Sequence, residues 1–123
     1  MKKLIASALL LLQASAYANK PTCHSSNGGY CSYTGEVARI YVNKSNLILM
    51  YFDTLMDVDE WEKAGLSARQ TDATIVSLSD SPEFAKLFYS TALAAQASGR
   101  QVQIQMRGVK NGYLMVDRIW LAQ

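Results

Sequence analysis

The sequence predicts a mainly β domain that contains one α-helix. Short runs of apolar or alternating residues are bounded by turn residues, which is typical of strands. One longer segment, between Ser81 and Gly99, has apolar residues at helical spacing and is expected to be the helix. The predicted strands cover residues 33–43, 46–53, 73–79, 100–107 and 113–121.

The first two predicted strands differ in pattern. In 33–43, residues 37–42 alternate between two faces, and Gly35 indicates a bulge or a close approach of the backbone. The second run, 46–53, is continuously apolar, as expected of a strand covered on both faces. Residues 43–46, Asn-Lys-Ser-Asn, connect the two strands as a hairpin turn.

The next segment is less regular. Residues 54–72 are mostly polar, and a short helical turn around 57–63 is expected to end at Gly65. Residues 73–79 then form the third strand. Its members Thr74, Val76 and Leu78 share one face.

The helix has clear start and stop signals. Ser81 suits the N-cap, Pro82 the first helical position and Glu83 the positive end of the helix dipole, while Gly99 supplies a left-handed stop. The residues expected to face the core are Phe84, Leu87, Phe88, Thr91, Ala92 and Ala95. A weaker second stripe consists of Tyr89, Leu93 and Gln96.

The last two strands complete the order β-β-β-α-β-β. Residues 100–107 alternate strictly, with Val102, Ile104 and Met106 on one face and Gln101, Gln103, Gln105 and Arg107 on the other. Asn111-Gly112 is a hairpin signal before 113–121. A helix between the third and fourth of five strands predicts an OB-fold barrel. A flat α+β sheet is the competitor, and the barrel is favoured because closure removes exposed strand edges.

The first eighteen residues have the pattern of a cleavable secretory signal peptide. Lys2 and Lys3 precede an apolar run, and Ala16-Tyr17-Ala18 has the small residues that signal peptidase requires. The apolar run, 4–12, is short of the roughly 20 residues that span a bilayer, so a retained anchor is the weaker reading and no transmembrane segment is expected. We therefore expect a single domain, residues 19–123, exported to the periplasm or secreted.

Removal of the signal peptide also changes the charge. Lys2 and Lys3 account for the excess of 12 Lys and Arg over 10 Asp and Glu, so the processed chain has no net charge. A nucleic-acid partner is therefore not expected, because such proteins usually carry a basic excess.

Cys23 and Cys31 are the only cysteines. In an oxidising compartment they are expected to form a disulfide around the turn-forming residues Asn27-Gly28-Gly29. Metal binding by these cysteines and His24 is the alternative, but the spacing does not fit a zinc site and a fourth ligand is missing. Neither a metal nor a cofactor is predicted.

Residues 84–104 and the Thr34-Gly35-Glu36-Val37 segment resemble the B subunits of AB5 toxins, in the group of subtilase-cytotoxin and pertussis-like B subunits. In this group an aromatic-rich helix leads through a glycine into an alternating strand. The resemblance implies an OB-fold that assembles as a homopentamer, with the helices lining a central pore, and that binds glycans of host glycoproteins or glycolipids. It also raises the prospect of a catalytic A subunit as partner.

The same resemblance suggests where a sugar binds. Relatives that bind sialic acid use a serine hydroxyl just before the glycine of the first strand, and Thr34 stands at that place. A tyrosine on the fourth strand contacts sugar in some relatives, whereas the matching position here is Met106. The relatives also carry cysteines further along the chain.

Aromatic residues near the first strand extend this tentative glycan site. Tyr30, Tyr33 and Trp61 lie in segments read as loop or strand end, where exposed rings stack on sugars or else cover the ends of the barrel. Ser32, Thr34 or Asn27 would bind sugar hydroxyl groups. The stripe of Gln101, Gln103, Gln105 and Arg107 is read as solvated surface, or as a subunit or glycan contact.

No catalytic residues are predicted. His24 is the only histidine and lies in a predicted loop, whereas a catalytic triad needs an oriented, buried one. The acidic cluster Asp53, Asp57, Asp59, Glu60 and Glu62 lacks the calcium-loop pattern and is read as a solvated face, with a small glycoside hydrolase the weakest alternative. The main alternative to a glycan-binding toxin subunit is a periplasmic protein-binding or inhibitor protein that acts without a toxin partner.

Overall fold

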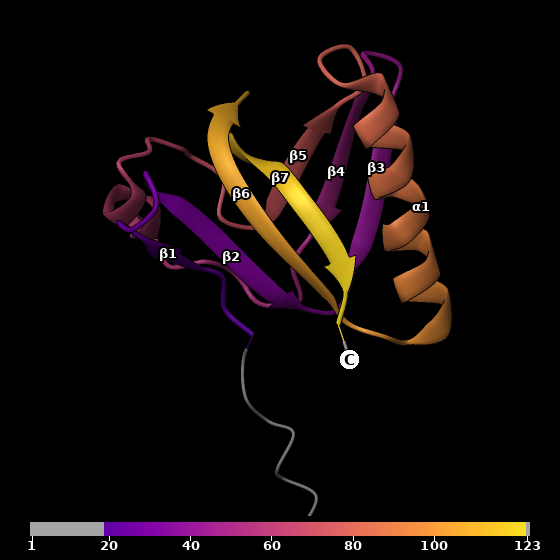
Figure 1. The fold of residues 1–123 in the computed structure, drawn as a ribbon, viewed down its shortest axis with the longest axis horizontal. Coiled ribbons are helices and arrows are strands. Elements are labelled where there is room, and N and C mark those ends of the chain that lie inside the picture. Colours follow the sequence, from indigo (N-terminus) through magenta and orange to yellow (C-terminus); the bar gives the residue numbers. More distant parts are fainter. Residues whose placement is uncertain (1–18, 123) are drawn as a thin grey trace, which may run out of the picture.

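The computed structural model describes residues 19–122, so the predicted signal peptide, residues 1–18, lies outside the described residues. Within this range all strands belong to one mixed sheet, and a single α-helix packs beside it (Figure 1). The elements are β1 (Thr22–His24), β2 (Tyr30–Gly35), β3 (Arg39–Asn43), β4 (Leu47–Tyr51), the 3-10 helix η2 (Glu60–Ala64), β5 (Ala73–Ser77), α1 (Pro82–Ser98), β6 (Val102–Lys110) and β7 (Tyr113–Leu121).

The sheet has seven strands in the order β1-β2-β6-β7-β5-β4-β3. All neighbouring strands are antiparallel except β5 and β7, which are parallel. The prediction of a mainly β fold with one helix is confirmed. The prediction of a five-stranded barrel is wrong, because the sheet is not closed and the described strands β1 and β3 form its two edges.

The predicted and observed sheets differ first at residues 33–43, which were expected to form one continuous strand. Residues 36–38 leave the ladder and divide it, so that β2 pairs with β6 while β3 pairs with β4. The other additional strand, β1, pairs with the start of β2. The sheet therefore has seven strands instead of the predicted five.

A buried tyrosine fixes this division. The Tyr33 side chain is only 1% exposed, and its hydroxyl accepts a hydrogen bond from the Asp53 N–H at 2.8 Å and donates one to the Glu36 carbonyl. The Asp53 carboxylate in turn accepts the Glu36 N–H at 2.9 Å. A Cβ on Gly35 would lie 2.6 Å from the Tyr33 hydroxyl oxygen, so only glycine fits beside it. Burial raises the pKa of Tyr33, which keeps the hydroxyl protonated.

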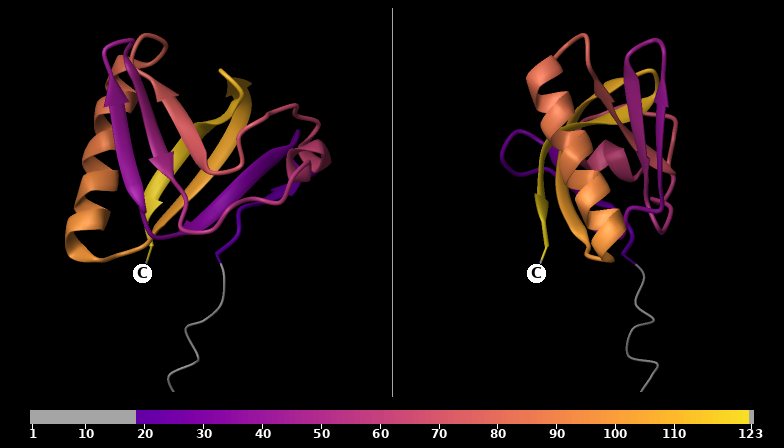
Figure 2. Two further views of the ribbon diagram at one scale, coloured as in Figure 1. Left: turned by 180° about the vertical axis from the view of Figure 1, so that it is seen from behind. Right: turned by 90° about the vertical axis from the view of Figure 1, so that its right-hand side faces the viewer.

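The helix α1 packs beside β4, β5 and β7 (Figure 2). It ends at Gly99, which adopts the predicted left-handed conformation, and it begins at Ser81 without a hydrogen bond from that side chain. Its buried stripe is narrower than predicted, because Leu87 is 67% exposed and Thr91 half-buried. The buried residues of α1 are Ala85, Phe88, Ala92 and Ala95.

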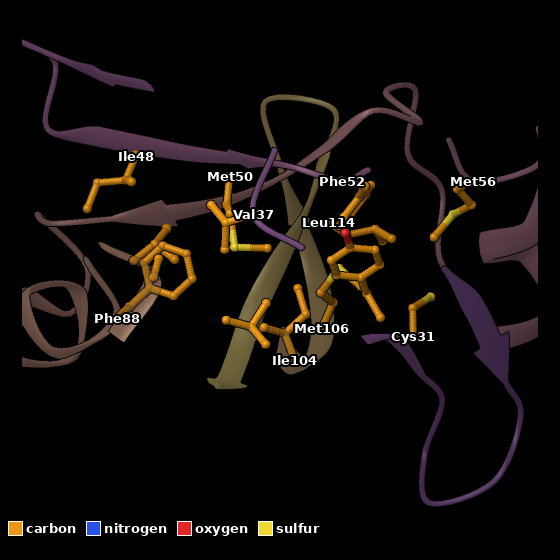
Figure 3. Close-up of a cluster of buried hydrophobic side chains, with 14 of the residues drawn as sticks. Cys31, Val37, Ile48, Met50, Phe52, Met56, Phe88, Ile104, Met106 and Leu114 are labelled. Atoms are coloured by element: carbon orange, nitrogen blue, oxygen red, sulfur yellow. The ribbon is translucent and has the colours of Figure 1, made fainter. Parts of the chain in front are cut away.

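The core lies between this helix and the inner side of the curved sheet. Phe88 of α1, Met50 of β4 and Ile104 of β6 belong to one cluster of buried side chains (Figure 3). Tyr33 and Phe52 pack with ring centroids 4.7 Å apart further along the same cluster. The polar segment before β5 contributes η2, whose Trp61 is buried and which ends at Gly65. The core therefore runs from the helix to the N-terminal strands.

The substitution Tyr33→Phe tests the division between β2 and β3. It keeps the ring but leaves the Asp53 N–H and the Glu36 carbonyl without their partner, and we expect the free energy of unfolding to fall by about 1–3 kcal/mol. Tyr89→Phe, which removes a hydroxyl from an exposed ring on α1, is the control and should change it by under about 0.5 kcal/mol. Urea denaturation measures both. Equal effects of the two substitutions would contradict this role of Tyr33.

Candidate functional site

The outer side of β1, β2, β6 and β7 presents one continuous set of polar and aromatic side chains. The strand register aligns them in three rows. The first row contains Thr34, Gln103 and Trp120, the second Thr22, Ser32, Gln105 and Arg118, and the third His24 and Tyr30, with the Arg107 side chain over the Tyr30 ring. None of these ten residues is buried. We call this surface the polar platform.

Strict alternation produces the platform. Successive side chains of a strand point to opposite faces of a sheet. In β2, Cys31 and Tyr33 point into the core, which turns Ser32 and Thr34 outward. In β6, the buried residues Val102, Ile104 and Met106 do the same for the glutamines between them.

One end of the platform is held by contacts among its own side chains. His24 Nε2 lies 3.3 Å from the Ser32 hydroxyl oxygen, and the rings of His24 and Tyr30 lie 4.8 Å apart. The guanidinium of Arg107 lies 5.4 Å from the centre of the Tyr30 ring, in cation–π geometry. The Tyr30 ring is therefore positioned by His24 and by Arg107.

Arg107 also fixes the loop between β1 and β2. It donates hydrogen bonds to the carbonyls of Asn27 at 2.8 Å and Gly29 at 3.1 Å. Its Nε lies 3.9 Å from the carboxylate of Asp117, which also pairs with Arg118 at 3.1 Å. Asp117 is the extra residue of a bulge, because Gln105 pairs with Arg118 and the next residue with Val116.

The predicted disulfide between Cys23 and Cys31 is present and joins directly opposed residues of β1 and β2. A carboxylate anchors the same hairpin, since Glu60 accepts the Cys23 N–H at 2.9 Å and pairs with Lys63 at 3.1 Å. The bond from Cys23, assisted by Lys63, holds the pKa of Glu60 below its usual value against the opposing effect of burial. β1 is thus joined covalently to β2 by the disulfide, and to η2 by a charge-assisted hydrogen bond to Glu60.

The structure separates the predicted glycan residues into two groups. Thr34 is exposed, Ser32 and Tyr30 are half-exposed, and all three lie together on the platform. Tyr33 faces the opposite side and is buried, so the expectation of an exposed ring at this position is wrong. The same holds for Trp61, which is 5% exposed and packs under the hairpin.

Sequence reasoning missed one large residue of the platform. Trp120 is 39% exposed and stands opposite Gln103 in the β6–β7 ladder. The alternation of Ile119 and Leu121 with Arg118 and Trp120 was the available signal. Two glutamines of the stripe that was read as solvated or as a contact surface lie on the platform: Gln103 between Thr34 and Trp120, and Gln105 between Ser32 and Arg118.

The acidic cluster is used largely for structure. Asp53 binds the backbone at the β2–β3 division, Asp57 pairs with Lys20 at 3.3 Å, and Glu60 anchors β1. Within residues 19–122, no group of three or more His, Cys, Asp or Glu side chains is arranged to hold a metal ion. Over that same range, no helix is long and apolar enough to cross a membrane.

Comparisons with known proteins add no relative. No protein-family model matches the chain, no curated protein matches it, and no solved structure matches its fold. The resemblance to toxin B subunits therefore rests on the short sequence segments quoted for it.

The substitution Glu60→Gln tests the anchor of the N-terminal hairpin. It replaces a charged acceptor by a neutral one, and we expect the free energy of unfolding at pH 7 to fall by about 1 kcal/mol. Because the pKa of Glu60 is lowered by folding, its contribution is present above the unfolded value, near 4.5, and is lost as the pH falls through the folded value. The deficit of the variant should therefore shrink towards pH 3.

Glu62→Gln is the matched control, since Glu62 is an exposed residue of the same short helix. Unfolding by urea between pH 3 and pH 7 compares the three proteins. A deficit of Glu60→Gln that does not change with pH, or an equal deficit of Glu62→Gln, would contradict the anchor.

Proposed function

We propose that this chain is an exported, non-enzymatic receptor-binding module that resembles the B subunit of an AB5 toxin and binds glycans of host cells. The polar platform is the observation that carries the proposal. It combines hydroxyl, amide and aromatic side chains on an outer sheet face, which is the chemistry that sugar hydroxyl groups and sugar C–H faces require.

The platform has the size of a short oligosaccharide. Alternate residues of a strand lie about 6.7 Å apart and neighbouring strands about 4.8 Å apart, so three rows over four strands cover roughly 13 by 14 Å. Ser32 and Thr34 offer hydroxyl groups within this area, and Gln103 and Gln105 offer amides that both donate and accept. Tyr33, although buried, positions Ser32 and Thr34 by holding the strand between them.

The strand order also fits the OB-type topology that the resemblance implies. β2 and β3 follow one another through residues 36–38, so they count as two halves of one bent strand. Without the short β1, five strands remain, with α1 between the third and fourth. We therefore propose that the open sheet is a variant of the OB-fold topology.

Self-association into a homopentamer is part of the proposal. β3 is an edge strand, and its exposed Val42 lines one groove with Tyr89 of α1. An apolar groove of about 300 Å³ lies there, lined by Val42, Ile48, Leu78, Ala85, Lys86 and Tyr89. A second copy of the chain would cover both the unpaired strand edge and these apolar side chains, which soluble proteins usually protect.

The substitution Thr34→Val tests glycan binding. It keeps the shape of the side chain and removes the hydroxyl, so we expect binding to the preferred glycans of an array to fall about fivefold to tenfold. Ser32→Ala should have a similar effect, whereas Ser45→Ala, in the distant β3–β4 turn, should have none. If wild-type protein binds no glycan on the array, the proposed function is wrong.

The oligomeric state tests the assembly separately. Light scattering of the processed protein, residues 19–123 with its disulfide intact, should give five times the mass of one chain. Val42→Lys should shift the mass towards the monomer, because it places a charge in the apolar groove. Val58→Lys, in an exposed loop, is the control. A wild-type monomer at micromolar concentration would overturn the pentamer and favour a binding or inhibitor protein that acts alone.

A further inference from the structure

We infer that Trp120 is the stacking surface of the platform and receives the apolar C–H face of an uncharged pyranose ring, while Gln103 and Thr34 bind its hydroxyl groups. The inference rests on the proposed glycan-binding function and assigns a residue and a class of ligand to one part of it.

The ladder places these three side chains in one row. Thr34 is the register partner of Gln103, and Gln103 is the register partner of Trp120. Directly opposed residues point to the same face, so the row crosses three adjacent strands over about 10 Å. A ring lying on Trp120 would therefore have its edge near the Gln103 amide, with the Thr34 hydroxyl one strand further on.

The neighbours of Trp120 in the strand set the face on which it lies. Ile119 and Leu121 are half-buried and pack against the core, which directs Trp120 to the outer face. Its exposure of 39% contrasts with the buried Trp61, the other tryptophan of the described chain. A large aromatic side chain fixed on a strand loses little conformational freedom when a ligand covers it.

The surroundings of Trp120 define the ligand. At the centre of a protein–protein interface, an exposed tryptophan would be flanked by other apolar side chains. Its neighbours in this row, Gln103 and Thr34, are instead polar and uncharged. The nearest cation of the platform, Arg118, already pairs with Asp117 at 3.1 Å. The row thus combines one apolar surface with neutral hydrogen-bonding groups. A pyranose presents the complementary arrangement, because it has C–H groups on one face and hydroxyl groups around its edge.

The fluorescence of Trp120 provides the test. In the variant Trp61→Phe, Trp120 is the only tryptophan of the processed chain, and acrylamide quenching measures its accessibility. We expect methyl β-galactoside or methyl β-glucoside to reduce the quenching, and the acyclic polyol sorbitol to leave it unchanged. If Trp61→Phe does not fold, the wild-type protein serves instead, because its Trp61 is buried and contributes little to the quenched fraction.

Array binding separates this inference from the proposed function. Trp120→Ala should lose about tenfold or more of the wild-type signal, and Trp120→Phe should recover part of it. If Trp120→Ala binds as wild type does while Thr34→Val does not, the stacking role is wrong and the glycan-binding function stands. Equal protection by sorbitol also overturns stacking. If neither the wild type nor any variant binds an array glycan, both are wrong.

Discussion

The division of the first long strand at Gly35 is the constraint on which the rest of the structure depends. The Tyr33 hydroxyl joins the carbonyl of Glu36 and the N–H of Asp53, so Tyr33 is locked to a residue twenty positions further along the chain at the point where the chain bends. Because of this bend, β2 lies beside β6 while β3 continues beside β4. One segment thereby supplies both a strand of the platform and an edge strand on the far side of the sheet.

This arrangement also determines which side chains form the polar platform. Tyr33 and Cys31 lie in the core, and their burial fixes which residues of β2 point outward. The disulfide from Cys31 to Cys23 ties β1 to β2, and the hydrogen bonds of Arg107 hold the β1–β2 loop against β6. A binding surface built in this way loses little entropy on binding, because regular strands rather than mobile loops position its side chains.

Much of the fold could be predicted from the sequence. The helix, its glycine stop, the two hairpin turns and the disulfide all follow from local signals, and the structure contains each of them. Gly35 signalled a bulge or a close backbone approach, which the structure contains, but the break at 36–38 also depends on the contact of Tyr33 with Asp53, which no local pattern contains. Leu87 was assigned to the core for a related reason, since periodicity alone does not give the width of the buried stripe.

The candidate site was predicted in part. Ser32, Thr34 and Tyr30 do lie together, but Tyr33 was included with them because the strand was expected to begin at residue 33 rather than at Tyr30. With the correct start, the period of two already separates Tyr33 from its neighbours. Gln103 and Trp120 join the site only through pairing across three strands, which depends on tertiary structure.

The central claim, that the polar platform is a glycan-binding surface, is tested most directly by titrating isotope-labelled protein with an array-selected oligosaccharide and following backbone amide shifts by NMR. The account predicts that the largest shifts fall on β2, β6 and β7 around Thr34, Gln103 and Trp120. Shifts confined to the groove between β3 and α1 would contradict it.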